Sequence, residues 1–141
     1  VECAVNDTLD GACTNSYENL IRKILLSDSH PALVLLFATN ETGDSAEEAE
    51  AELGRYYELP MISYGKAVLP EVEAGSFTWS EIAEDIVHPN NRGHAIFAGL
   101  ITMYLEEICS RLDRIRIDEA RLQSYELPEP ITPQIPMISP R

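Results

Sequence analysis

Residues 32–38 read Ala-Leu-Val-Leu-Leu-Phe-Ala, an apolar run without a polar interruption. Such a run is typical of a β-strand that is covered on both faces, as the strands of a parallel sheet usually are. Residues 1–5 and 60–64 form shorter segments of similar character. We therefore predict three strands, at 1–5, 32–38 and 60–64.

Segments with helical periodicity separate these strands. Ser16 is suited to cap a helix whose apolar residues recur at intervals of three and four, and His30-Pro31 ends this pattern. A Glu- and Ala-rich helix is predicted over residues 45–57. For this helix we expect Asp44 as the N-cap and Glu47 as the capping-box residue.

The last predicted helix begins at Asn90 or Asn91, because either side chain can cap it. Its apolar stripe contains Ile96, Phe97, Leu100, Ile101, Tyr104, Leu105 and Ile108. Strands that alternate with helices imply an α/β fold, with a parallel sheet and right-handed crossovers. In such folds the active groups gather at the carboxyl ends of the strands.

Two loops at these ends carry residues suited to catalysis. The first predicted strand runs into Asn6, and the last helix is preceded by Asp85 and His88. Three-residue spacing lets the carboxylate hold one ring nitrogen of the imidazole, which leaves the other nitrogen free to take a proton from a serine hydroxyl. The Asn6 amide is a donor of the kind that stabilises an oxyanion.

These residues resemble the motifs of the SGNH (GDSL-type) hydrolases. Residues 4–7, Ala-Val-Asn-Asp, resemble the family's GxND block, with Ala4 where the family usually has glycine. Residues 85–90, Asp-Ile-Val-His-Pro-Asn, resemble its DxxHPN block, and Gly93-His94 follow as in many members. The resemblance covers about residues 1–108.

The resemblance implies a flavodoxin-like three-layer α/β/α fold and ester hydrolysis through an acyl-enzyme. His88 would be the general base and then the general acid, Asp85 would orient it, and Asn6 would donate to the oxyanion. The family's nucleophilic serine and two N-terminal strands would come from sequence before Val1, so the missing N-terminal half of the domain is an expected partner. Residues 56–64 resemble members that act on acylated carbohydrates.

Other residues have simpler interpretations. Gly43-Asp44-Ser45 spells the family's nucleophile block, but it follows the Asn6 block instead of preceding it, so Ser45 is a weak candidate nucleophile. We expect His94 to support the loop from a helix face and His30 to be structural. Phe77 and Trp79 either line an acyl or sugar pocket or pack in the core.

The alternative is a non-catalytic α/β domain that binds carbohydrate or protein. The net charge of −14, with only ten Lys and Arg residues, argues against nucleic-acid binding. No apolar run is long enough for a membrane span, and three scattered cysteines and three histidines make a metal site improbable. No cofactor is expected.

We divide the chain into residues 1–112, part of a hydrolase domain, and residues 113–141. The latter segment has prolines at positions 128, 130, 133, 136 and 140. This spacing favours an extended conformation, as in a linker or an arm toward a further domain.

Overall fold

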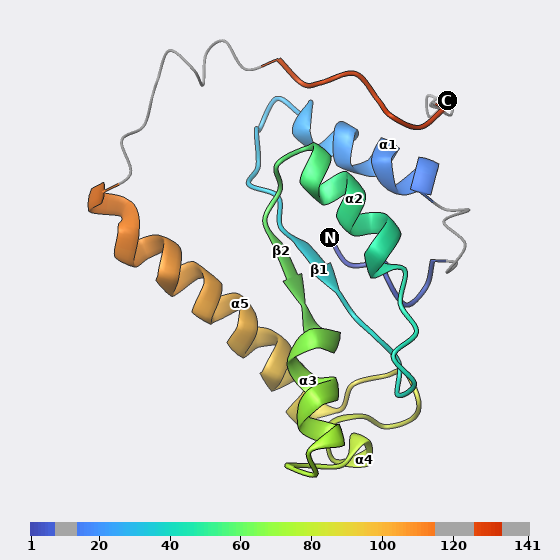
Figure 1. The fold of residues 1–141 in the computed structure, drawn as a ribbon. Coiled ribbons are helices and arrows are strands. Elements are labelled where there is room, and N and C mark those ends of the chain that lie inside the picture. Colours follow the sequence, from blue (N-terminus) through green and yellow to red (C-terminus); the bar gives the residue numbers. More distant parts are fainter. Residues whose placement is uncertain (8–13, 115–125, 134–141) are drawn as a thin grey trace.

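The computed structural model describes residues 1–7, 14–114 and 126–133. The elements follow one another in the order α1 (Thr14–Leu25), β1 (Leu35–Phe37), α2 (Glu47–Tyr56), β2 (Met61–Ser63), α3 (Tyr64–Glu73), α4 (Trp79–Ile82) and α5 (Asn91–Arg111), ending in a short 3-10 turn, Leu112–Arg114 (Figure 1). The strands β1 and β2 pair in parallel, with Leu35 opposite Met61 and Phe37 opposite Ser63. The predicted α/β class with a parallel sheet is confirmed.

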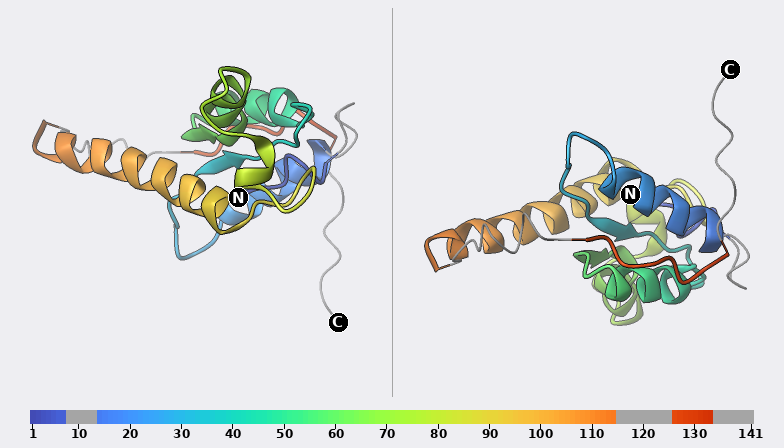
Figure 2. Two further views of the ribbon diagram at one scale, coloured as in Figure 1. Left: turned by 90° about the horizontal axis from the view of Figure 1, so that it is seen from below. Right: turned by 90° about the horizontal axis from the view of Figure 1, so that it is seen from above.

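Helices cover the strands on both sides. Figure 2 shows α1 and α2 on opposite sides of β1 and β2. A first group of buried side chains joins α1, β1 and α2 and includes Tyr17, Ile21, Leu35, Phe37 and Leu53. A second group, which includes Tyr64, Val68, Trp79 and Ile82, packs with the first half of α5. The second core includes Ile82 and Ala83, which directly precede the loop that carries Asp85 and His88.

The strand predicted at residues 1–5 does not form. The Val1 backbone nitrogen donates to the Val34 carbonyl at 2.8 Å, and Leu36 N–H donates to the Val1 carbonyl at 2.8 Å, so the chain lies alongside β1 at Val1. It turns away at once, because the amides of Asn6 and Asp7 both donate to the Cys3 carbonyl. The other two strands are shorter than their apolar runs predicted.

Two of the predicted helix caps are wrong. Helix α1 begins at Thr14, so Ser16 lies inside it. The Asp44 carboxylate accepts hydrogen bonds from Asn40 and Thr42, while the amide of Glu47 donates to the Ser45 hydroxyl at 3.2 Å. The side chain of Glu47 is not part of a capping box, because it accepts from the Ser63 hydroxyl at 2.6 Å and pairs with Lys66 at 2.6 Å.

The cap of α5 is confirmed. The Asn90 side-chain oxygen accepts from the amides of Arg92 and Gly93, at 2.9 and 3.1 Å. The apolar stripe of α5 is only partly packed: Ile96, Phe97 and Leu100 contact the second core, whereas other members, including Leu105, are exposed. In Figures 1 and 2, α5 extends away from the strands beyond these contacts.

Helices α3 and α4 were not predicted. Helix α3 begins directly after β2, with Ser63 accepting from the Lys66 amide at 3.1 Å, and its interior contains Pro70. The proline and the following Gly75 interrupt the helical pattern. A signal for α4 was nevertheless present, since Thr78 and Glu81 have the spacing of a capping box and form one.

Candidate active site

The loop between α4 and α5 is closed at its neck. Ala83 and Pro89 form an isolated antiparallel bridge, in which Glu84 N–H donates to the His88 carbonyl at 2.8 Å. Asn90 N–H donates to the Ile82 carbonyl at 3.1 Å. This neck brings both ends of the Asp85–His88 segment together.

Within the loop, Asp85 and His88 are hydrogen-bonded to each other. The Nδ1 atom of His88 lies 2.8 Å from Oδ2 of Asp85. The other carboxylate oxygen accepts from the backbone amides of Val87, at 2.8 Å, and His88, at 2.7 Å. Because Nδ1 faces a carboxylate, the neutral imidazole carries its proton there, and Nε2 is left as the proton acceptor.

These contacts keep Asp85 ionised. The backbone N–H of His88, then the His88 ring and the Val87 N–H, lower the pKa of Asp85 to about 2. The carboxylate is therefore charged at any pH at which an imidazole can act as a base. The side chain of His88 is 76% exposed, so its ring is accessible to a substrate.

A cavity of about 370 Å³ lies beside His88 and is also lined by Asn6, from the N-terminal segment. Its lining residues are Glu2, Val5, Asn6, Leu36, Ala38, Thr39, Tyr64, Trp79, Ala83, Val87, His88, Pro89, His94 and Phe97. Most of them are apolar, and the polar ones include Asn6 and His88 from the two loops, together with Glu2, Thr39 and His94. The rings of Tyr64 and Phe97 stack at a centroid distance of 3.8 Å.

The position of Asn6 is set by the turn that ends the first segment. The Cys3 carbonyl accepts from the Asn6 amide at 2.8 Å, and the Ala4 carbonyl accepts from Ala46 N–H at 2.7 Å. These bonds tie the turn to the start of α2. The exposed side chain of Asn6 thus reaches the cavity from the end of the segment beside β1.

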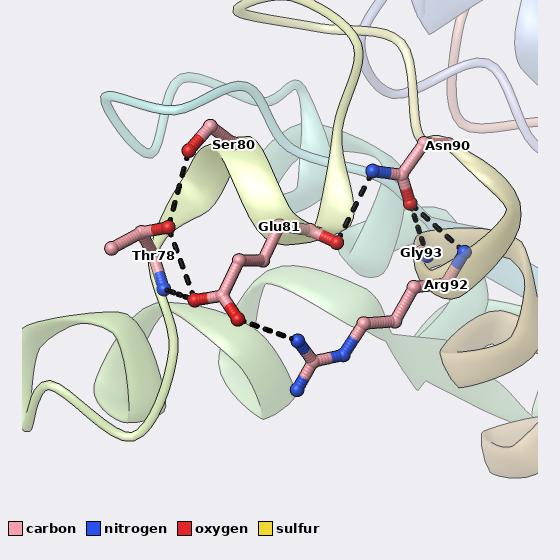
Figure 3. Close-up of polar contacts among 6 residues, drawn as sticks. All are labelled: Thr78, Ser80, Glu81, Asn90, Arg92 and Gly93. Atoms are coloured by element: carbon pink, nitrogen blue, oxygen red, sulfur yellow. Dashed lines mark hydrogen bonds and ion pairs between the residues drawn. The ribbon is translucent and has the colours of Figure 1, made fainter.

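A polar network fixes α4 to the beginning of α5 (Figure 3). The Glu81 carboxylate accepts from Thr78 N–H at 2.7 Å and forms an ion pair with Arg92 at 2.9 Å. The Asn90 side-chain amide donates to the Glu81 carbonyl at 3.1 Å. The same two elements flank the Asp85–His88 loop, so this network holds both ends of the loop in place.

The remaining sequence candidates have different surroundings. The Ser45 hydroxyl donates to the Ala38 carbonyl at 2.7 Å, and Ser45 lines a separate hollow between α2 and α3. His30 is exposed in the connection after α1.

His94 lines the cavity beside His88, whereas the sequence predicted only that it would support the loop from a helix face. Trp79 lines the cavity too, whereas Phe77 packs on the second core and lies under the Arg92 guanidinium.

Within the described ranges, 1–7, 14–114 and 126–133, no cluster of three or more His, Cys, Asp or Glu side chains is arranged to hold a metal ion. Within the same residues, no helix combines the length and the apolar character that a membrane span requires.

The fold and this loop can be compared with known proteins. No protein family and no curated protein sequence matches the chain. Solved structures of a two-domain esterase active on acetylated mannans do match. One, crystallised with mannopentaose, has 31% identity and a TM-score of 0.80 over 93% of this chain. Another has 32% identity and a TM-score of 0.78 over 92%.

The chain shares its fold with an esterase. It spans about a third of the length of the esterase chains that it matches, 33% in both comparisons. The relationship therefore concerns one part of a two-domain protein.

Proposed function

We propose that this chain carries the Asp–His part of the active site of an SGNH-class serine esterase that acts on acylated carbohydrates. The observation that carries the proposal is the 2.8 Å contact between Asp85 and His88, beside a cavity that Asn6 also lines. The similarity to an esterase active on acetylated mannans supports both the ester chemistry and the carbohydrate substrate.

In the proposed reaction, Nε2 of His88 takes the proton of a serine hydroxyl as the serine oxygen attacks the ester carbonyl. Asn6 donates a hydrogen bond to the oxyanion that forms. His88 then passes the proton to the departing sugar oxygen, and a water molecule hydrolyses the acyl-serine by the same steps. Asp85 stays ionised throughout and stabilises the imidazolium.

We place the nucleophilic serine outside residues 1–141. No serine is among the residues that line the cavity in the described part of the chain. Thr39 has a hydroxyl there, but it is directed at the carbonyls of Asn40 and Asp44, at 3.3 and 3.4 Å. Ser45→Ala should accordingly leave turnover unchanged, and loss of turnover in that variant would make Ser45 the nucleophile.

The proposal is tested by His88→Asn in the full-length protein, with release of acetate from acetylated mannan as the measurement. Loss of the base should lower kcat by about a thousandfold or more, with the fold intact by circular dichroism. His30→Asn is the matched control, because His30 is exposed and its φ of 42° suits asparagine. Near-normal turnover in His88→Asn, or binding of the mannan without any release of acetate by the wild type, would favour the non-catalytic binding domain instead.

A further inference from the structure

Trp79, the first residue of α4, contacts the backbone of the Asp85–His88 loop. Its indole N–H donates to the carbonyl oxygen of Asp85 at 2.8 Å. The side chain is only 6% exposed and belongs to the second core, so the indole has a fixed position from which to donate. Its ring also lines the cavity.

The Asp85 carboxylate has no comparable support from outside its loop. All its hydrogen bonds among the described residues come from Val87 and His88, which belong to the same loop. The next peptide is tied to the body of the protein, since the Ile86 carbonyl accepts from Glu41 N–H at 2.9 Å. Among the described residues, the indole of Trp79 is thus the side chain that donates to the Asp85 carbonyl.

We propose that Trp79 is a positioning residue for the Asp85–His88 pair. The indole holds the Asp85 carbonyl and so restricts the backbone torsion at Asp85. The carboxylate projects from the Cα atom of this residue toward Nδ1 of His88. This inference rests on the proposed function for its effect on turnover, but the orientation of His88 can be measured without any substrate.

The ordinary alternative is that Trp79 only fills the core. Two replacements separate these roles. Trp79→Phe removes the N–H and part of the ring, whereas 3-benzothienylalanine at position 79 replaces the N–H with sulfur and keeps the shape of the indole. Tyr56→Phe is the control, because it removes another aromatic donor that bonds a backbone carbonyl at 2.8 Å, that of Glu129, away from the site.

The first measurement is the tautomer of His88, read from the nitrogen chemical shifts of its ring in the full-length protein. The wild type and Tyr56→Phe should hold the proton on Nδ1. Both replacements of Trp79 should give a mixture of tautomers and faster exchange of the Nδ1 proton. An unchanged tautomer in the 3-benzothienylalanine protein, which preserves packing even if Trp79→Phe fails to fold, would overturn the inference.

The second measurement is turnover of an acetyl ester. Misorientation of the base should lower kcat by about tenfold to a hundredfold and leave KM within about twofold. A larger KM with unchanged kcat would show that Trp79 serves only as a cavity wall and would overturn the positioning role. If the tautomer changes as expected but the wild type hydrolyses no ester, the proposed function fails and the positioning role stands.

Discussion

The carboxylate of Asp85 uses both oxygens within one turn of chain, one for two backbone amides and the other for the His88 ring. This arrangement fixes the side chain before any substrate binds. Because the pKa of Asp85 is lowered to about 2 from its ordinary 3.8, the ionised form contributes stability above about pH 4, which is lost as the pH falls through 2. Activity changes near neutral pH should not originate from this carboxyl.

Asp85→Asn should therefore lower kcat much more than it raises KM. An amide can donate to Nδ1 and so stabilises the wrong tautomer of the imidazole, and it does not stabilise the imidazolium. We expect kcat to fall about a hundredfold or more, measured with an acetyl ester over a range of pH. A small effect would mean that a serine–histidine pair suffices, and it would remove Asp85 from the mechanism without removing His88.

A second carboxyl, that of Glu50 on α2, is buried beside Tyr17 and Asp7. It is 2% exposed, and its oxygens lie near the Tyr17 hydroxyl and the Asp7 carboxyl without meeting ordinary hydrogen-bond geometry. Burial, with the nearby charge of Asp7, raises the pKa of Glu50 from 4.5 to about 7. Between about pH 4.5 and pH 7, the folded protein therefore keeps a proton on Glu50 that the unfolded chain has released.

This difference predicts a loss of stability with rising pH. The free energy of unfolding should fall between about pH 4.5 and pH 7, by about 3 kcal/mol in total, because ionisation opposes burial of Glu50. Glu50→Gln should remove most of this slope, as measured by urea unfolding across that range. The exposed Glu48→Gln is the control, and an equal slope in wild type and Glu50→Gln would assign the pH dependence to other groups.

At the scale of elements, the site depends on how closely α5 approaches α4. A Cβ atom at Gly93 would lie 2.1 Å from the Ile82 carbonyl oxygen and 2.8 Å from Cβ of Pro89. Only glycine permits this approach, which places the first turn of α5 beneath the neck of the catalytic loop. Gly99, farther along the same helix, has open space around it.

The two glycines form a matched pair for mutation. Gly93→Ala should destabilise the protein by about 2 kcal/mol or more and lower turnover, because the helix must move away from α4. Gly99→Ala should instead stabilise it by about 0.5–1 kcal/mol, since alanine is the better helix former. Thermal unfolding measures both, and a stable, active Gly93→Ala protein would show that the contact between α4 and α5 does not position the loop.

At the scale of the whole molecule, residues 126–133 return to the body and lie along α1 and α2 (Figure 1). The buried carboxylate of Glu18 accepts from the amides of Ile131, at 2.9 Å, and Thr132, at 2.8 Å. Arg22 donates to the Pro128 carbonyl on the same side. The domain boundary after residue 112, and a further domain beyond it, stay predictions.

Glu18→Gln should release this segment. The amide cannot accept from every donor that the carboxylate satisfies, so we expect a loss of about 1–3 kcal/mol in stability. Hydrogen exchange at the amides of Ile131 and Thr132 should become fast, while exchange in α5 stays as in the wild type. Continued protection of both amides would show that other contacts hold the segment.

The sequence alone was sufficient for features that depend on neighbours within a few residues. The run at 32–38 predicted β1, Asn90 predicted the start of α5, and the spacing of Asp85 and His88 predicted their contact. In each case the local backbone geometry determines the outcome, because a cap or a three-residue turn forms in the same way in many surroundings.

The rest was decided by tertiary structure. Glu47 forms an ion pair with Lys66 at 2.6 Å instead of a capping box. Asn6 and His88 line one cavity, and Glu18 accepts hydrogen bonds from a segment more than a hundred residues away. Each of these side chains has a neighbour that only the packing of the helices on the strands brings within reach. Burial makes an unpaired carboxylate costly, so Glu18 and the largely buried Glu47 take the partners that the fold provides rather than those that the local sequence offers.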